Sequence, residues 1–144
     1  MNNLQALLIL ISITIITSMF DFYTSDIKEC LENTKSWNTK YRIIFNILFH
    51  HFFANFSFIG WMFNNVIVLI IFCISPIIVA VHWNTNSNKC FITDITNKLC
   101  QFTKYKKFNE ITTMLDFSDR SFSLLFIYRF VATMYGVYKL YNLL

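Results

Sequence analysis

The longest stretch without a charged residue constrains this chain more than any other feature. No Lys, Arg, Asp or Glu occurs over residues 43–88, and the apolar part, 43–83, is 41 residues long. As one helix, at about 1.5 Å per residue, it would measure about 60 Å, twice the hydrocarbon thickness of a bilayer. The stretch is therefore predicted to form two membrane spans, 43–63 and 66–83, with Asn64-Asn65 as the hinge.

An alternative division of the same stretch makes 43–55 an interfacial helix, followed by one span over 56–81. The two ends of the chain supply further candidate spans. The run 4–20 contains no charge and, at 17 residues, reaches the lower limit for a spanning helix. The apolar stretch 121–143 is also long enough, and it ends in the tyrosine-rich pattern of a membrane interface.

The first candidate span has two interpretations. A cleaved signal peptide begins with basic residues and has small residues before the cut. This chain begins Met-Asn-Asn, and its first apolar run ends Ser18-Met19-Phe20, so an uncleaved anchor is favoured. A cleaved signal peptide is the alternative, and it would leave three spans.

Composition agrees with a membrane protein. The chain is 56% hydrophobic and 14% charged, whereas soluble domains average about 25% charged residues. We therefore expect one all-α domain over residues 1–144, an integral membrane helical bundle of three or four transmembrane helices. Loops 21–42 and 84–120 connect the spans. The second loop carries an apolar stripe that predicts a short amphipathic interfacial helix, formed by Phe91, Ile95, Leu99 and Phe102.

The basic residues predict the orientation of the bundle. Four spans place both loops on one side of the membrane, and ten of the twelve Lys and Arg residues lie in those loops. Because cytoplasmic loops carry an excess of Lys and Arg, both long loops are predicted to be cytoplasmic. With three spans the loops would fall on opposite sides. The lipid bilayer is the expected partner, and the sequence shows no nucleic-acid footprint.

Polar residues within the second span are candidates for function. Asn46, His50 and Asn64 fall on one helical face together with Ser57 and Gly60. The simpler interpretation is interhelical hydrogen bonding and close packing around Gly60. The alternative is a polar pathway for protons or ions.

The last span contains Arg129, the one charge well inside a predicted span. Its side chain is expected to extend to the loop side, to pair with Asp116 or Asp119, or to bind a lipid phosphate. On the same face, Ala132 and Gly136 form a small-xxx-small pattern that allows close helix approach. The Ala132/Gly136 and Gly60 faces are therefore the predicted surfaces for a homo- or hetero-oligomer.

Histidine and cysteine residues give no metal motif. The adjacent His50 and His51 diverge by about 100° on a helix and cannot face one ion, although His51 or His82 could ligate a haem. No CxxC pair occurs, so a zinc ribbon is not supported. Cytoplasmic loops would keep the cysteines as free thiols, whereas lumenal loops would let Cys30 pair with Cys90 or Cys100. No metal and no cofactor is predicted.

The segment "VHWNTNSNKCFITDITNKLC", residues 81–100, resembles a group of small multipass membrane proteins of unknown function. These carry a span ending near a tryptophan, an Asn-containing turn, Cys-x-Leu-Thr and a further helix. The matching positions are Trp83, Asn86 or Asn88, Cys90, Ile92, Thr93, Asn97 and Leu99. The sequence departs from the pattern at Phe91, where proline is usual in bacterial members, and at Thr96, where Glu is usual.

Half of the chain consists of Phe, Tyr, Met, Ile, Asn and Lys, residues with A/T-rich codons. In this respect it is similar to small membrane proteins of large DNA viruses of protists, which implies a host or virion membrane. The resemblance implies a layout and no established activity. It singles out a set of motif residues as site candidates: His82, Trp83, Asn86, Cys90 and Thr93.

The sequence predicts a non-enzymatic structural or partner-binding membrane component. The first alternative is a small ion or proton channel or transporter lined by Asn46, His50, Asn64 and Arg129. The second alternative is a haem- or metal-binding membrane enzyme. No nucleophile elbow, phosphate-binding loop or paired carboxylates within a span occur, so no catalytic residue is assigned.

Overall fold

The computed structural model describes residues 2–24, 26–86, 90–102 and 119–144 of the chain, without the side chains of 24, 83, 84 and 119–126. All regular elements in these ranges are helical, which confirms the all-α prediction. The elements are α1 (Asn3–Thr24), α2 (Ile27–Asn33), α3 (Trp37–Ile59), the 3-10 turn η1 (Gly60–Met62), α4 (Val66–Thr85), α5 (Phe91–Leu99) and α7 (Asp119–Tyr141).

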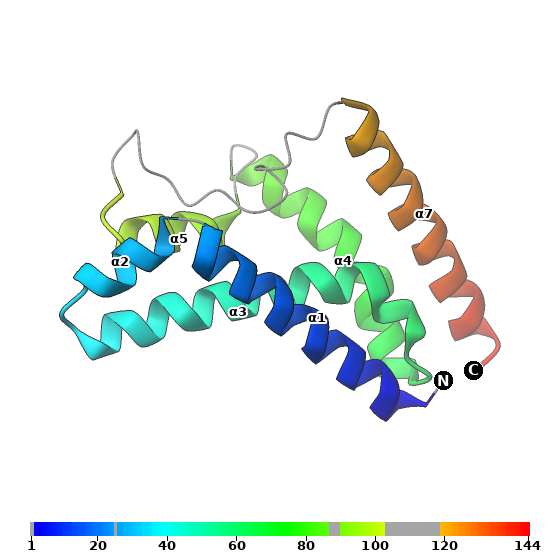
Figure 1. Ribbon diagram of the computed structural model, residues 1–144. Coiled ribbons are helices and arrows are strands. Elements are labelled where there is room, and N and C mark those ends of the chain that lie inside the picture. Colours follow the sequence, from blue (N-terminus) through cyan, green and yellow to red (C-terminus); the bar gives the residue numbers. More distant parts are fainter. Residues whose placement is uncertain (1, 25, 87–89, 103–118) are drawn as a thin grey trace.

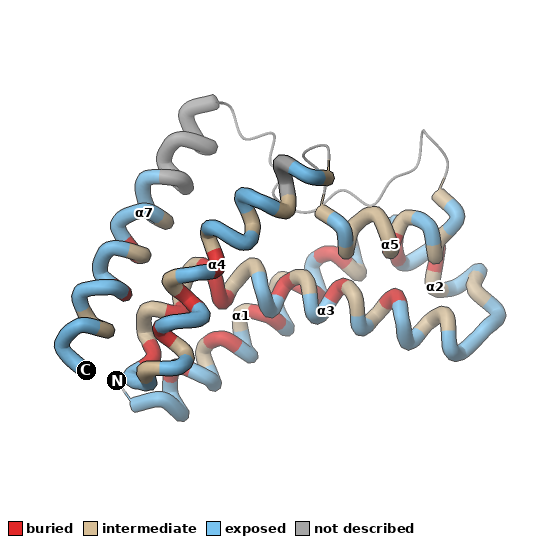
Figure 2. The backbone as a smooth tube through the Cα atoms, turned by 180° about the vertical axis from the view of Figure 1, so that it is seen from behind, coloured by how far each residue is buried: buried red, intermediate tan, exposed pale blue. Residues whose placement is uncertain are grey.

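The helices form an elongated group with two distinct ends. Both termini lie beside the turn that joins η1 to α4, whereas α2 and α5 lie at the other end (Figure 1). Helix α1 packs mainly on α3, α5 also packs on α3, and α7 packs on α4 and η1. Buried residues follow the inner faces of α1, α3 and α4, and the outer faces are exposed (Figure 2).

Helix α1 extends beyond the stretch expected from the sequence. Its start is fixed by a reciprocal cap, in which the Gln5 N–H donates to Asn2 Oδ1 at 2.8 Å and the Asn2 N–H donates to Gln5 Oε1 at 3.1 Å. It ends at Thr24 and not near residue 20, so Asp21 is helical. The residues buried on its inner face are spaced by four, four, four and three positions: Ala6, Leu10, Thr14, Ser18 and Asp21.

Helices α3 and α4 form the hairpin expected from the sequence. The chain turns at Asn64-Asn65, where the Asn65 side chain accepts the Val68 N–H at 3.1 Å and caps α4. The Asn64 N–H donates to Asn3 Oδ1 at 2.7 Å, which ties the turn to the start of α1. Helix α3 begins at Trp37 and not at residue 43, because Ser36 accepts the Thr39 N–H and caps it earlier.

Helix α4 contains a proline and remains helical through Thr85. Pro76 has no N–H, so it cannot bond to the carbonyl of Phe72 four residues earlier. The Ser75 hydroxyl donates to that carbonyl at 2.8 Å instead. In an apolar environment this replacement matters, because an unpaired backbone carbonyl costs several kcal/mol.

Phe72 lies at the centre of the first apolar cluster, which joins α1, α3, α4 and α7 and includes Ala6, Leu10, Phe56, Phe63 and Ala132. A Cβ added to Gly60 would lie 2.6 Å from the Phe72 ring, and one added to Gly136 would lie 2.9 Å from the same ring. The two glycines thus let α3 and α7 approach α4. The Gly60 and Ala132/Gly136 faces, predicted for oligomer contacts, are occupied by α4 of the same chain.

The second apolar cluster lies at the α2–α5 end and contains Ile27, Cys30, Ile43 and Ile47, with Leu99 and Phe102 packed against it. Helix α5 ends with Gln101 in the left-handed region at φ 53°. The Phe102 N–H then donates to the Asn97 carbonyl at 3.1 Å, and this reversal returns Phe102 to the cluster. Part of the apolar stripe expected to contact lipid therefore contacts α2 and α3.

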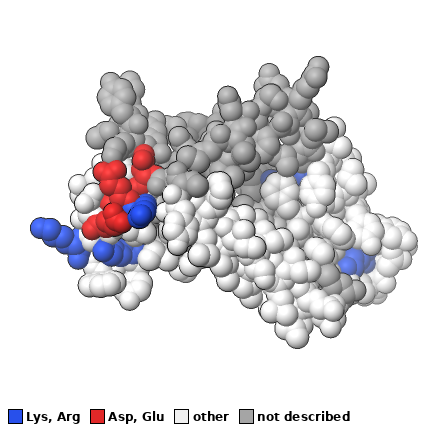
Figure 3. Space-filling view, in the orientation of Figure 1, with Lys and Arg blue, Asp and Glu red and all other residues white. Residues whose placement is uncertain are grey.

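Two helical segments in the described residues are long and apolar enough to cross a membrane, Asn3–Tyr23 and Trp37–Met62. The apolar segment Val66–His82 of α4 is shorter. Large hydrophobic side chains point outward from all of these and from α7: Ile16 is 67% exposed, Ile67 68% and Phe130 60%. Charged side chains gather over α2 and the beginning of α3, and most of the other described residues on the face shown are uncharged (Figure 3).

Candidate functional site

Within the segment 82–93, His82 at the end of α4 contacts the start of α5. The Phe91 N–H, at the first position of α5, donates to His82 Nε2 at 3.0 Å. The His82 and Phe91 rings also contact edge to face at 6.4 Å. His82 therefore caps a helix whose first N–H groups have no partner within the helix. Asn86 continues the last turn of α4, and the side chain of Trp83 lies outside the described residues.

Cys90 and His50 are brought together from positions forty residues apart. Cys90 is the N-cap residue of α5, and its Sγ lies 3.4 Å from His50 Nδ1 on α3. Cys90 is a half-buried free thiol, and Thr93, one turn into α5, is also half-buried.

The four polar residues expected to line a pathway do not converge. His50 faces α5, Asn46 is half-buried one turn earlier, and Asn64 is exposed in the hairpin turn, bonded to Asn3. Arg129 lies on α7, with Nε and Nη2 buried and without a hydrogen-bond partner in the described part of the chain. Its expected partner Asp116 and the Asp119 side chain lie outside the described residues.

A buried acid–base pair joins α1 to α3 and was not predicted from the sequence. His51 Nε2 lies 2.6 Å from Asp21 Oδ2, with Asp21 fully buried and His51 6% exposed. One turn deeper, the Asn55 side-chain amide donates to Thr17 Oγ1 at 3.1 Å. The hydroxyls of Thr14 and Ser18 are buried on the same face of α1 and have no hydrogen-bond partner in the described residues. We call these six residues the polar seam.

The polar seam separates the two apolar clusters. On its far side Leu10 and Ala6 continue the same face of α1 into the cluster around Phe72. The sequence prediction placed Asp21 in a loop and treated His51 as an interfacial or hydrogen-bonded side chain. Five residues at intervals of four, four, four and three positions share one helical face: Ala6, Leu10, Thr14, Ser18 and Asp21. This spacing is the signal in the sequence that could have revealed the pair.

The three histidines have separate contacts. His50 meets Cys90, His51 meets Asp21, and His82 accepts the Phe91 N–H. The described residues contain no group of three or more His, Cys, Asp or Glu side chains placed to hold a metal ion. Each printed contact uses one ring nitrogen of its histidine, Nδ1 in His50 and Nε2 in His51 and His82.

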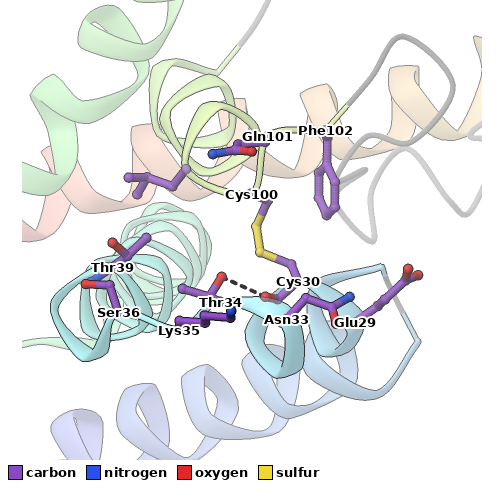
Figure 4. Close-up of a pocket in the computed structure, with 11 residues that line it drawn as sticks. Glu29, Cys30, Asn33, Thr34, Lys35, Ser36, Thr39, Cys100, Gln101 and Phe102 are labelled. Atoms are coloured by element: carbon purple, nitrogen blue, oxygen red, sulfur yellow. Dashed lines mark hydrogen bonds between the residues drawn. A yellow bond between two sulfur atoms is a disulfide. The ribbon is translucent and has the colours of Figure 1, made fainter.

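A disulfide between Cys30 and Cys100 links α2 to the end of α5, across 70 residues of sequence. Cys30 is buried in the second apolar cluster. The two cysteines lie in the wall of a hollow of about 450 Å³ (Figure 4). Polar side chains of α2, of the α2–α3 turn and of the end of α5 line the same hollow. Thr34 closes one side, where its hydroxyl donates to the Cys30 carbonyl at 2.7 Å. The bond contradicts the free thiols expected at Cys30 and Cys100 for cytoplasmic loops, and it matches one of the two pairings expected for lumenal loops.

Comparison with protein-family models, with curated proteins and with solved structures gave no match. The resemblance to small multipass membrane proteins and to viral membrane proteins therefore stays a prediction. Over the residues that the structure describes, the fold defines an all-helical protein with two helices apolar and long enough to cross a membrane.

Replacing His82 with alanine should loosen the start of α5. The Phe91 N–H loses its acceptor, a cost of about 1 kcal/mol, and its amide hydrogen should exchange about fivefold faster. Hydrogen exchange followed by mass spectrometry or NMR measures this rate. Thr85→Ala is the matched control, because the Thr85 hydroxyl bonds only to carbonyls of its own helix. Equal exchange in H82A and wild type would show that His82 is not the cap.

Removing the disulfide should destabilise the α2–α5 end of the isolated protein. Cys30→Ser and Cys100→Ser should each cost about 2–4 kcal/mol of free energy of unfolding, because the open chain regains conformational entropy. The double variant should cost no more than either single one. Cys73→Ser leaves the bond intact and serves as the control. The unfolded wild type should bind polyethylene-glycol maleimide at Cys73 and Cys90 only, until a reductant is added; labelling at four sites without reductant would contradict the bond.

Proposed function

We propose that this chain is a multipass membrane component that acts through assembly and partner contacts. The observation that carries the proposal is the outward apolar surface of α1, α3, α4 and α7, set against charges collected at the α2–α5 end. Such a surface suits lipid, because contiguous exposed apolar patches of this extent are rare on soluble monomers. The lipid bilayer is then the first partner, and the membrane is that of a host cell or a virion.

The disulfide supports two membrane crossings between the loops, over residues 43–83. Cys30 follows α1 and Cys100 follows α4, so a bond between them requires both loops to lie on one side of the membrane. The chain between them then crosses an even number of times, which the α3–α4 hairpin provides. The closeness of both termini at the opposite end of the helices also supports this arrangement (Figure 1).

The charges and the disulfide give opposed indications of which side the loops face. Ten basic residues in the loops favour the cytoplasm, whereas lasting disulfides are typical of oxidising compartments. Loop charge acts while the helices insert, and the redox state of the cysteines is set afterwards. We therefore propose cytoplasmic loops, with a Cys30–Cys100 bond that the glutathione pool opens and oxidising conditions close.

The membrane placement is tested by alkaline carbonate extraction and flotation of membranes from cells that produce the chain. The protein should stay in the floating membrane fraction, and release by carbonate would overturn the proposal. A membrane-impermeant maleimide tests orientation at Cys90 in a Cys30→Ser, Cys100→Ser background, where an opened disulfide adds no thiols, with Cys90→Ser in the same background as the control. Labelling should require permeabilised cells, and labelling of intact cells would place the loops outside.

Assembly is tested by native mass spectrometry and by crosslinking in membranes. Because the glycine faces are occupied by α4, partners are expected on the charged α2–α5 end or on the outer faces of the helices. Substitutions on the exposed face of α2, such as Glu32→Lys, should weaken a partner contact without altering membrane extraction. A chain that is monomeric and uncrosslinked in its native membrane would remove this proposal.

A small channel or transporter is the second candidate, supported by the buried polar residues between α1 and α3. The cluster around Phe72 opposes it, because apolar side chains close the far end of the polar seam. Liposomes containing the purified protein test the point. Ion or proton flux that is lost in Asn46→Ala or His50→Ala would replace the assembly proposal with this one.

A further inference from the structure

The polar seam is an unusual way to pack two apolar helices. Asp21, fully buried, and His51, 6% exposed, meet at an interface where alanine or leucine would pack without loss. Burying two ionisable groups carries a desolvation cost, and hydrophobic pairs of similar volume are often as stable or more stable. Ionisable residues inside membrane helices are typical of proton and ion sites.

We propose that the Asp21–His51 pair is a proton-binding site within the helix bundle, reached only from the α2–α5 end. This goes beyond the assembly proposal and does not depend on it. The carboxylate and the imidazole lie 2.6 Å apart, a distance at which one proton is shared through a charge-assisted hydrogen bond. With the proton the pair is neutral overall, and without it the pair holds a net negative charge away from water. The neutral state is the one that burial favours.

The neighbouring hydroxyls point to a proton and not to a larger ligand. Thr14 is 6% exposed and Ser18 1%, and their oxygens have no hydrogen-bond partner in the described residues. No water can reach these atoms, so the interface has no room for a hydrated ion. A hydroxyl can rotate to donate or accept, so Ser18, one turn from Asp21, can follow a change of charge on the pair.

Other ionisable groups around the pair have contacts of their own. His50, next to His51 on α3, meets its ring edge on at 5.6 Å between centroids and contacts Cys90 of α5. Also on α5, Asp94 pairs with Lys98 at 2.7 Å. The charged residues of α2 are exposed to solvent: Asp26 at its N-cap, Lys28, Glu29 and Glu32. His50 and Cys90 are therefore the groups through which a proton from the α2–α5 end would pass.

The opposite end of the seam is closed. Beyond Thr14 the interface consists of Leu10, Ala6 and the rings of Phe56, Phe63 and Phe72. None of these side chains can accept or donate a proton, so among the described residues this end of the seam offers no entrance. The site can bind and release a proton but cannot conduct one across the bundle in this conformation.

NMR of the full chain in lipid nanodiscs tests the proposal. With ¹⁵N-labelled histidine and ¹³C-labelled aspartate, the His51 ring and the Asp21 carboxyl should respond to pH between about 4 and 9 with shared midpoints, because a coupled pair titrates as a unit. In Asp21→Asn the response of the His51 ring to pH should differ from that in the wild type, since the carboxylate that faces the ring is gone. The exposed Asp26→Asn should leave it unchanged.

Two results would overturn the site. One is a His51 signal in the wild type that does not respond over this pH range, which needs no variant. The other is an equal His51 titration in Asp21→Asn and Asp26→Asn. The single entrance has its own test in liposomes that contain a pH-sensitive dye. The wild type should hold a pH gradient as well as protein-free liposomes do, and a steady leak would contradict the closed end.

Discussion

Phe72→Ala should lower the free energy of unfolding by about 3–5 kcal/mol, the range found when a large buried aromatic ring is removed from a core. Phe72 is fully buried, and its ring occupies the space beside Gly60 and Gly136 that a larger side chain would fill. Its ring also meets Phe56 edge to face at 6.2 Å between centroids. The cavity that alanine leaves cannot collapse easily, because two glycines carry no side chains to fill it. Equilibrium unfolding in one fixed detergent mixture measures the loss.

Ile71→Ala is the matched control, because Ile71 neighbours Phe72 on α4 but is half exposed on the outer face. Gly60→Ala supplies a second check. Its new Cβ would meet the ring at 2.6 Å, an overpacking cost of about 1–3 kcal/mol. That cost should disappear when Phe72 is already alanine. If Phe72→Ala cost no more than Ile71→Ala, the ring would not be the contact that joins the four helices.

The sequence predicted the helices where their physical signals are local. The division of residues 43–83 into two helices follows from length, since 41 apolar residues are too long for one span. The polar pair Asn64-Asn65 indicates where the hinge lies. The start of α3 was predicted six residues too late. The polar residues before Ile43 were assigned to a loop, although Ser36 is a good N-cap residue and nothing after it breaks a helix.

The candidate site depended on pairings that no single segment reveals. Asp21 was assigned to a loop because it ends an apolar run, and only the length of α1 places it opposite His51, thirty positions away. The choice of Cys100 over Cys90 as the partner of Cys30 depends on how α5 lies on α3. Gly60 and Gly136 were correctly recognised as sites of close approach. That both glycines contact Phe72 depends on the tertiary structure and could not be read from the sequence.

His51→Ala should lower the free energy of unfolding by about 3–5 kcal/mol, as much as the loss of the Phe72 ring, but for an electrostatic reason. The substitution removes the His51 partner of the Asp21 carboxylate, and breaking a buried ion pair by removing one partner is strongly destabilising. Phe53→Ala is the control, because Phe53 is 48% exposed on the outer side of the same helix. Unfolding in the same detergent mixture makes the two losses comparable. A loss no larger than that of F53A would mean that water reaches the pair.

The double variant Asp21→Leu with His51→Met separates stability from proton binding. Replacing both partners of a buried pair by apolar groups of similar volume is often neutral or stabilising, by up to about 4 kcal/mol. The double variant should therefore be at least as stable as the wild type and much more stable than H51A. A double variant as unstable as the single one would assign the pair a structural role within the seam. If it is stable, the pair is not needed to pack the two helices, since a leucine and a methionine hold α1 against α3 equally well.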